Sequence, residues 1–159
     1  MVAFIFSLMA LVLVALLLGV HLTGYLILNP ALRRLEAALY IPVKQSVDNT
    51  APRLAKPLML ASLALTAAAI TAGALEFIPA VEFAAIAALL ALLVTLWAIV
   101  RGDLPINREM AHWSVESPPP HWRAVRTGWE RFFGLRVAAN TLALLALGAA
   151  VVASASRLH

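Results

Sequence analysis

Cysteine is absent from this chain of 159 residues, and charged residues make up only 13% of it. The lack of thiols excludes disulfides, thiolate metal sites and CxxC redox chemistry. Any bound metal would need histidine, carboxylate or amide ligands. Scarce charge, together with a hydrophobic share of 63%, also excludes an ordinary soluble domain.

Four apolar runs, at residues 2–28, 57–77, 80–100 and 132–156, make up most of the sequence. Each exceeds the roughly 20 residues that a membrane-spanning helix needs. The first run has no basic segment before it and is too long for the core of a signal peptide, so we expect it to be retained. Segment 77–81 is short enough to make the second and third spans an antiparallel hairpin. The sequence thus predicts an all-α fold, a single-domain integral membrane four-helix bundle embedded in the lipid bilayer.

The basic residues are concentrated in the two long connections, 29–56 and 101–131. Ten Lys and Arg residues lie there, whereas only Arg157 lies beyond the opposite ends of the spans. Cytoplasmic loops carry the Lys/Arg excess, so both connections are predicted to be cytoplasmic and both termini external. The net positive charge then reports membrane topology, and no nucleic-acid partner is predicted. Residues 31–47 are predicted to form a basic amphipathic helix on the membrane surface.

Polar side chains are rare near the apolar runs, and six of them form two stripes. They are His21, Tyr25 and Asn29 on the first helix, and Trp129, Arg136 and Asn140 on the last. Spacings of four and seven residues place the members of each stripe on one helical face. Polar groups that face lipid are costly, so we expect the two stripes to face one another across the bundle.

Each of these side chains also has a simpler interpretation. Arg136 can extend its guanidinium to the lipid headgroups. Tyr25 and Trp129 can anchor the membrane interface, and Asn140 can join two helices through a hydrogen bond. His21 is the strongest candidate for a functional role, because even a neutral imidazole needs both a donor and an acceptor to be satisfied.

The connection 101–131 carries the most specific local pattern. It reads Leu-Pro-Ile-Asn-Arg at 104–108, then Trp113, a triple proline at 118–120 and Trp-Glu-Arg at 129–131, followed by Leu-Arg at 135–136. With Asn-Pro at 29–30 and Pro-Leu-Met at 57–59, this order resembles the anthrone oxygenase-like family of small four-helix membrane proteins. The resemblance extends over nearly the whole chain. The residues that match the family pattern are Asn107, Trp113, Trp129 and Arg136.

The resemblance implies an oxygenase that converts a flat, electron-rich aromatic molecule, such as an anthrone, to the quinone. The enolate of such a substrate reacts with oxygen directly, so no redox metal or other cofactor is obligatory. The protein has to deprotonate the substrate, orient it and stabilise an oxyanion.

The residues implied for this chemistry fall into two groups. For catalysis they are His21, Tyr25, Asn107 and Arg136, and for substrate binding they are Asn29, Trp113, Trp129 and Asn140. His21 or Tyr25 is expected to accept and relay the proton. Arg136 and Asn107 are expected to stabilise the enolate or peroxide, and the tryptophans to stack on the substrate.

Two other classes of function stay open. A non-enzymatic binding or assembly protein, including a homo-oligomer, fits the glycines that permit close helix packing, which are Gly19, Gly24, Gly73 and Gly148. A haem or copper site with His21 and His112 as ligands is the other alternative. It requires the connection around His112 to fold back. His112 and His121 are nine residues apart, a spacing that matches no zinc signature.

Overall fold

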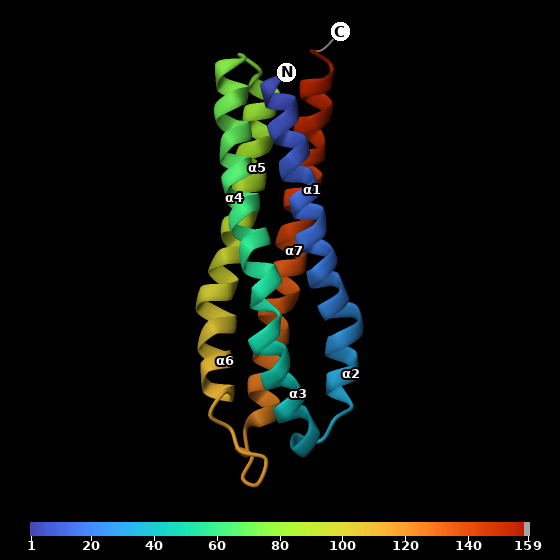
Figure 1. Ribbon diagram of the computed structural model, residues 1–159, viewed down its shortest axis with the longest axis vertical. Helices are drawn as coiled ribbons and strands as arrows, with labels where there is room; N and C mark the ends of the chain where they lie inside the picture. The colour runs from blue at the N-terminus through green and yellow to red at the C-terminus, as the bar shows by residue number, and fades with distance from the viewer. Residues whose placement is uncertain (158–159) are drawn as a thin grey trace.

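The computed structural model describes residues 1–157 and shows one elongated bundle of helices (Figure 1). No strand occurs in this range, and the all-α prediction is confirmed. The elements in chain order are α1 (Val2–Thr23), the π-helix η1 (Gly24–Leu28), α2 (Asn29–Arg33), α3 (Ala37–Thr50), α4 (Pro52–Leu75), α5 (Pro79–Ala98), the π-helix η2 (Ile99–Asp103), α6 (Leu104–Met110) and α7 (Trp122–Ala155).

Four helical segments are long and apolar enough to cross a membrane, which confirms the predicted number of spans. They are 2–33, 52–75, 79–110 and 122–155. Around the bundle, α1 packs on α4 and α7, and α5 packs on the same two helices. The α4–α5 turn lies at the same end of the bundle as the N-terminus and the end of α7 (Figure 1). We call this the hairpin end, and the opposite end, which contains 34–36 and 111–121, the loop end.

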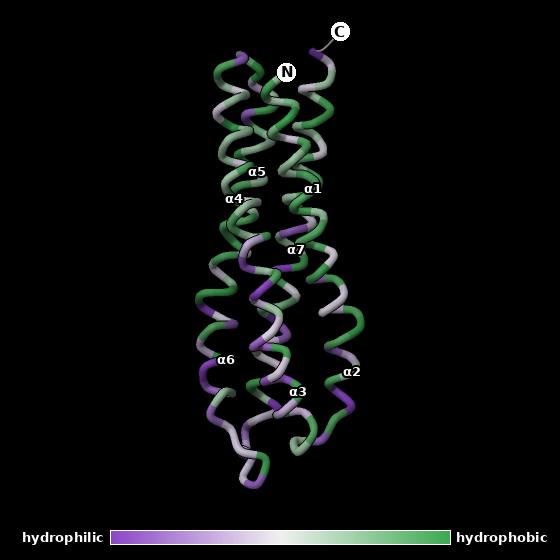
Figure 2. Tube along the Cα trace, in the orientation of Figure 1, coloured by the Kyte–Doolittle hydropathy of each residue, from purple (hydrophilic) through white to green (hydrophobic). Residues whose placement is uncertain are grey.

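The bundle is longer than a bilayer is thick. The 34 residues of α7 extend over about 51 Å, compared with a hydrocarbon core of about 30 Å. Figure 2 shows that residues are mainly hydrophobic in the half that contains α1, α4 and α5, whereas hydrophilic residues gather around α2, α3 and α6. The polar half therefore continues the bundle beyond the membrane on one side.

The predicted connections 29–56 and 101–131 are largely helical in the structure. They contain α2, α3, η2, α6 and the first turns of α7, so little more than 34–36 and 111–121 remains outside helices. The prediction of a surface-lying helix at 31–47 is wrong. α3 is part of the bundle, with Tyr40, Ile41 and Lys44 fully buried, because its apolar face packs on residues of the loop end.

The two π-helices allow the first and third spans to pass their prolines. A proline ring clashes with the carbonyl four residues earlier and offers it no N–H. In η1 and η2 one extra residue is accommodated, and the N–H groups of Asn29 and Leu104 donate to carbonyls five residues back. Pro30 and Pro105 follow directly. Each span therefore continues as a helix where its apolar run ends.

The hairpin turn is closed by a left-handed residue. Phe77 has a φ of 54°, and the N–H of Ile78 donates to the carbonyl of Gly73 at 2.8 Å. This is the bond pattern with which many helices end, although glycine is the usual left-handed residue. Pro79 then begins α5 at a position where a missing N–H costs nothing.

An apolar section fills the bundle between the hairpin end and the π-helices. Its buried residues come from all four spans, and are Ala10, Val14, Leu17, Met59, Ala88, Leu92, Ala143 and Leu147. The hydroxyls of Ser62 and Thr66 are buried in this region, but each donates to a carbonyl of its own helix at 2.7 Å. The section therefore separates the polar half of the bundle from the hairpin end.

Candidate functional site

A short chain of hydrogen bonds marks the membrane side of the site. The Thr95 hydroxyl donates to Oδ1 of Asn140 at 3.0 Å, and Nδ2 of Asn140 lies 2.6 Å from Nδ1 of His21. Because the hydroxyl occupies the amide oxygen, the amide nitrogen donates to Nδ1. A neutral imidazole then carries its proton on Nε2, where it acts as a donor. The predicted contact between the two polar stripes is observed at His21 and Asn140.

Arg136 and Asp103 form a buried ion pair on the same side of the bundle. Nη1 of Arg136 lies 2.8 Å from Oδ2 of Asp103, and the guanidinium lies 4.1 Å from the centre of the Phe133 ring. Arg136 therefore points into the bundle, and the alternative in which it extends to the headgroups is wrong. Oδ1 of Asp103 and Nε of Arg136 are buried without a hydrogen-bond partner within residues 1–157. Both atoms can serve a bound molecule.

Lys44 is the second buried cation. Its Nζ donates to both carboxylate oxygens of Asp48, at 2.5 and 2.6 Å, and to Oδ1 of Asn107 at 3.1 Å. The ammonium also lies 4.1 Å from the centre of the Trp129 ring, a favourable cation–π position. Burial lowers the pKa of Lys44 and raises the pKa of Asp48, while their mutual attraction opposes both changes. Burial thus disfavours the charged form of each group, and the ion pair between them offsets part of that cost.

Aromatic rings link these groups into one cluster. The Trp129 ring centre lies 5.0 Å from that of Phe133, which lies 5.8 Å from that of His21. We call the cluster the polar core, and its members are His21, Lys44, Asp48, Thr95, Asp103, Asn107, Trp129, Phe133, Arg136 and Asn140. Two cations and two carboxylates balance within it, as expected where charge is removed from water.

Asn29 is the only other predicted site residue that the structure buries in this half of the bundle. It lies on the chain between His21 and Leu32, and Leu32 packs in the loop-end cluster with Tyr40. The Nδ2 and Oδ1 atoms of Asn29 are buried and have no hydrogen-bond partner within residues 1–157. This amide therefore has a donor and an acceptor that no side chain or backbone group of residues 1–157 uses.

Besides Asn29, three predicted residues lie outside the polar core. Tyr25 is partly exposed, with its ring against Gly134. Trp113 lies in the apolar cluster of the loop end, where its carbonyl accepts a hydrogen bond from Gln45. His112 is exposed after the end of α6, and its Nδ1 lies 2.7 Å from the carbonyl of Arg108.

The position of His112 bears directly on the haem or copper alternative. It lies nine residues beyond Asp103 towards the loop end, whereas His21 contacts Asn140, one turn to the hairpin side of Arg136. The structure does not bring the two imidazoles together as axial ligands. Within residues 1–157, no three His, Asp or Glu side chains are grouped closely enough to hold a metal ion.

A groove reaches the polar core from the side, between the α3–α4 junction and α6. Its volume is about 320 Å³, and it is lined by Gln45, Asp48, Asn49, Pro52, Leu104, Asn107, Arg108 and Ala111. Asp48 and Asn107 are both hydrogen-bonded to Lys44. Because Lys44 is donor-only and holds Oδ1 of Asn107, the Nδ2 donors of that amide are directed elsewhere. We call this feature the lateral groove.

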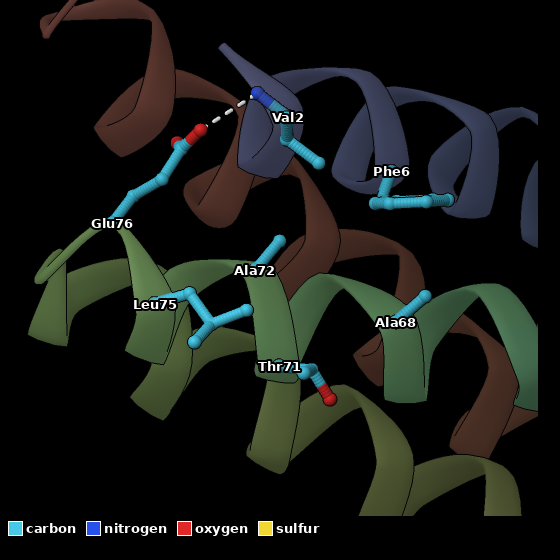
Figure 3. A pocket seen from close by; sticks show the side chains of 7 residues that line it. All are labelled: Val2, Phe6, Ala68, Thr71, Ala72, Leu75 and Glu76. Atoms are coloured by element: carbon cyan, nitrogen blue, oxygen red, sulfur yellow. Dashed lines mark hydrogen bonds between the residues drawn. The ribbon is translucent and has the colours of Figure 1, made fainter.

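A larger hollow, of about 410 Å³, lies at the hairpin end between α1 and α4 (Figure 3). Its walls are mainly apolar, and Val2, Phe6 and Leu75 are among the residues that line it. The carboxylate of Glu76 at its rim accepts hydrogen bonds from the N-terminal ammonium at 3.0 Å and from the Val2 N–H at 2.8 Å. Glu76 is the ionisable side chain of this hollow, and its carboxylate is already paired with the N-terminal ammonium.

Lys44, Asp48 and Asp103 were missed as site residues by the sequence interpretation. One physical signal was present for Asp103, because a buried Arg136 requires a carboxylate at a similar depth. The i,i+4 spacing of Lys44 and Asp48 predicts a helical ion pair. It does not distinguish a buried pair from the exposed pairs of a surface helix.

No protein-family model, curated protein or solved structure matches this chain. The resemblance to anthrone oxygenase-like proteins therefore depends on the quoted sequence pattern. Of the four residues that carry it, the structure places Asn107, Trp129 and Arg136 in the polar core and Trp113 outside it.

Proposed function

We propose that this protein is a membrane-embedded oxygenase that acts on a flat, electron-rich aromatic molecule with an acidic C–H group. The observation that carries the proposal is the buried Lys44–Asp48 pair, whose carboxylate and whose amide partner Asn107 both line the lateral groove. A carboxylate with a raised pKa beside a fixed cation and a free amide donor combines a base with an oxyanion site.

The reaction we propose needs no electron source besides the substrate. Asp48 removes a proton from the methylene group, which lies across the central ring from the carbonyl and is conjugated with it through the aromatic rings, and the resulting enolate oxygen is stabilised by Nδ2 of Asn107 and the charge of Lys44. Dioxygen adds to the enolate carbon to give a peroxide. Loss of water then leaves a second carbonyl, so that the CH₂ group and O₂ become C=O and H₂O. The carbon is oxidised by four electrons, which reduce O₂.

Two features of the polar core support this assignment. Trp129 and Phe133 provide aromatic surfaces beside Lys44 and Arg136, as a flat substrate requires. The orphaned Nε of Arg136 and amide of Asn29 are donors that a peroxide or carbonyl oxygen can use. In this arrangement Nε2 of His21 donates a hydrogen bond to the substrate, while the carboxylate of Asp48 acts as the base.

The apolar section favours a site with access from one side over a transport pathway. Val14, Leu17, Leu92 and Leu147 are fully buried between the polar core and the hairpin end. A substrate that reaches Lys44 through the lateral groove therefore has no polar route onward. This is expected of an enzyme or binding protein and not of a channel.

The test uses anthrone as the substrate and the protein reconstituted in phosphatidylcholine nanodiscs. Oxygen uptake and quinone absorbance are measured against empty nanodiscs, which give the spontaneous rate. Asn107→Ala should lower the protein-dependent rate about 10²- to 10³-fold, as in other enzymes that lose one oxyanion donor. Asn49→Ala is the matched control, because Asn49 lines the same groove and we assign it no role in the chemistry. Equal rates for Asn107→Ala and Asn49→Ala, or no rate above empty nanodiscs, would overturn the proposal.

A non-enzymatic assembly protein is the second candidate, and two glycines favour it. A Cβ added at Gly19 or Gly148 meets no atom within 4 Å, so neither glycine serves packing within the bundle. Both are free to approach a second copy in the membrane. If this is their role, Gly19→Leu should lower the oligomeric mass measured in detergent without changing the rate with anthrone.

A further inference from the structure

The two walls of the lateral groove have the same residue spacing. α6 and the residue that follows it contribute Leu104, Asn107, Arg108 and Ala111, at i, i+3, i+4 and i+7, and the α3–α4 wall contributes four residues with the same spacing from Gln45 to Pro52. Residues so spaced form one helical face. The walls are antiparallel, since α3 leads from the loop end into α4, whereas α6 continues the third span towards the loop end (Figure 1). Pro52 thus lies at the Leu104 end of the groove.

The groove changes from apolar to charged along its length. Leu104 directly follows η2, and Pro52 begins the span α4, so both lie at the end next to the membrane. Asp48 and Asn107 lie in the middle, and Arg108 is one helical turn, or about 6 Å, beyond Leu104 towards the loop end. A molecule that lies along the groove meets an apolar surface first and a cation one turn later.

Arg108 is the unneutralised charge of this groove. Its side chain is exposed, and among residues 1–157 no carboxylate forms an ion pair with it, in contrast to Arg33, Arg123 and Arg136. The other charged residue of the groove, Asp48, is already neutralised by Lys44. The groove therefore has an excess of one positive charge at its aqueous end, next to the amide of Asn107.

We propose that the lateral groove selects amphipathic aromatic carboxylates, with the ring system against Leu104 and Pro52 and the carboxylate on Arg108. This deepens the proposed function, because it names the substrate class of the same site and places the ring beside Asp48 and Asn107. Guanidinium groups bind carboxylates through charge-assisted hydrogen bonds, which are stronger than those between neutral groups. The apolar end keeps the ring close to the bilayer from which such a molecule partitions.

The experiment measures binding and requires no turnover. The probes are 9-anthracenecarboxylate and 9-anthracenemethanol, which share one ring system and differ in charge, and their fluorescence is titrated with protein in phosphatidylcholine nanodiscs. Arg108→Gln should weaken binding of the carboxylate roughly tenfold, as expected for loss of a hydrogen bond to a charged group. Binding of the alcohol should be unchanged. Arg101→Gln is the matched control, since Arg101 is exposed on η2 outside the groove, and it should change neither affinity.

Three outcomes would overturn the inference. The first is an unchanged preference for the carboxylate in Arg108→Gln, and the second is an equal loss in Arg101→Gln. The third concerns anionic lipid. Phosphatidylglycerol added to the nanodiscs would displace the carboxylate from the parent protein but not from Arg108→Gln, and the groove would then be assigned to anionic lipid. Selective binding without oxygen uptake would leave this inference standing and remove the oxygenase reaction. Oxygen uptake without charge selectivity would remove this inference and leave the oxygenase reaction standing.

Discussion

Arg136 on α7 and Asp103 at the end of η2 are joined by a 2.8 Å ion pair, and both side chains are buried where the apolar runs of the spans end. Asp103 is the last residue of the π-turn η2, two residues before Pro105. Asp103 is thus aimed at Arg136 by the same extra residue that accommodates Pro105. A carboxylate so placed provides the counterion without which a buried guanidinium is very costly.

Removal of one partner should therefore be far more damaging than removal of both. Asp103→Asn should lower the free energy of unfolding by about 3–5 kcal/mol, because Arg136 stays buried without its counterion. The double variant Asp103→Leu with Arg136→Met should recover most of this loss. Unfolding in detergent, followed by circular dichroism, measures both. Glu36→Gln, which removes the exposed partner of Arg123, is the control and should change little. A small effect of Asp103→Asn would show that water reaches the pair.

The Lys44–Asp48 pair predicts a pH dependence of stability. Burial lowers the pKa of Lys44 below its ordinary 10.5, whereas the unfolded chain keeps the ordinary value. Between the two values the unfolded state holds a proton that the folded state has released, so the free energy of unfolding rises with pH in that window. As the pH rises towards 10.5, the parent protein should therefore gain stability relative to the double variant Lys44→Met with Asp48→Leu. Parallel stability profiles over this range would contradict the lowered pKa.

The hydrogen bond between Asn140 and His21 can be tested by a double-mutant cycle. His21→Phe keeps the ring volume but leaves Nδ2 of Asn140 buried without an acceptor, which should cost about 1–3 kcal/mol. The double variant with Asn140→Leu should cost less than the sum of the single variants. Additive losses in thermal unfolding would mean that the two side chains are not coupled. Turnover of anthrone should also fall in His21→Phe, if Nε2 donates to the substrate.

Phe77 provides a test of backbone strain at the hairpin end. A non-glycine residue with a φ of 54° carries a strain of roughly 1–2 kcal/mol. Phe77→Gly should therefore raise the free energy of unfolding. The expected net gain is about 1 kcal/mol, because the greater conformational entropy of glycine in the unfolded chain offsets part of the relieved strain. Phe77→Ala is the matched control, since it removes the ring but keeps the Cβ. An equal gain from both variants would assign the effect to the exposed ring.

Membrane orientation can be measured by cysteine labelling, because the parent chain has no cysteine. Ser117 at the loop end and Ala80 after the hairpin turn are both exposed. Ser117→Cys should be protected from an impermeant maleimide in intact cells, whereas Ala80→Cys should react, since the basic connections are expected in the cytoplasm. The opposite pattern would place the lateral groove outside the cell. The expectation that the C-terminus is external concerns His159, which lies outside the described residues.

Hydropathy predicted the four spans and the tight hairpin because both depend on local properties. An apolar run of sufficient length has few alternatives to a spanning helix, and a turn of a few residues can only join antiparallel neighbours. The contact between His21 and Asn140 was also predictable, since two buried polar side chains at similar depth need each other. These inferences required no knowledge of the remaining chain.

The rest of the site was not predictable because the apolar runs end before the helices do. The first apolar run ends at residue 28, yet α2 follows η1 without a break, and α4 begins at Pro52, five residues before the second run begins at Pro57. Lys44 in turn resembles a solvated lysine until Trp129 and Asn107 are known to surround it. Its burial depends on how three distant segments pack, which neither periodicity nor composition encodes.

The apolar section has a consequence for the energetics of the cell that holds this protein. Lys44, Asp48, Asp103 and Arg136 form ionisable groups inside a membrane bundle, and such groups can in principle conduct protons down the membrane potential. Between them and the hairpin end, Val14, Leu17, Leu92 and Leu147 are fully buried and have no side-chain donor or acceptor. These four side chains therefore offer protons no relay between the polar core and the hairpin end.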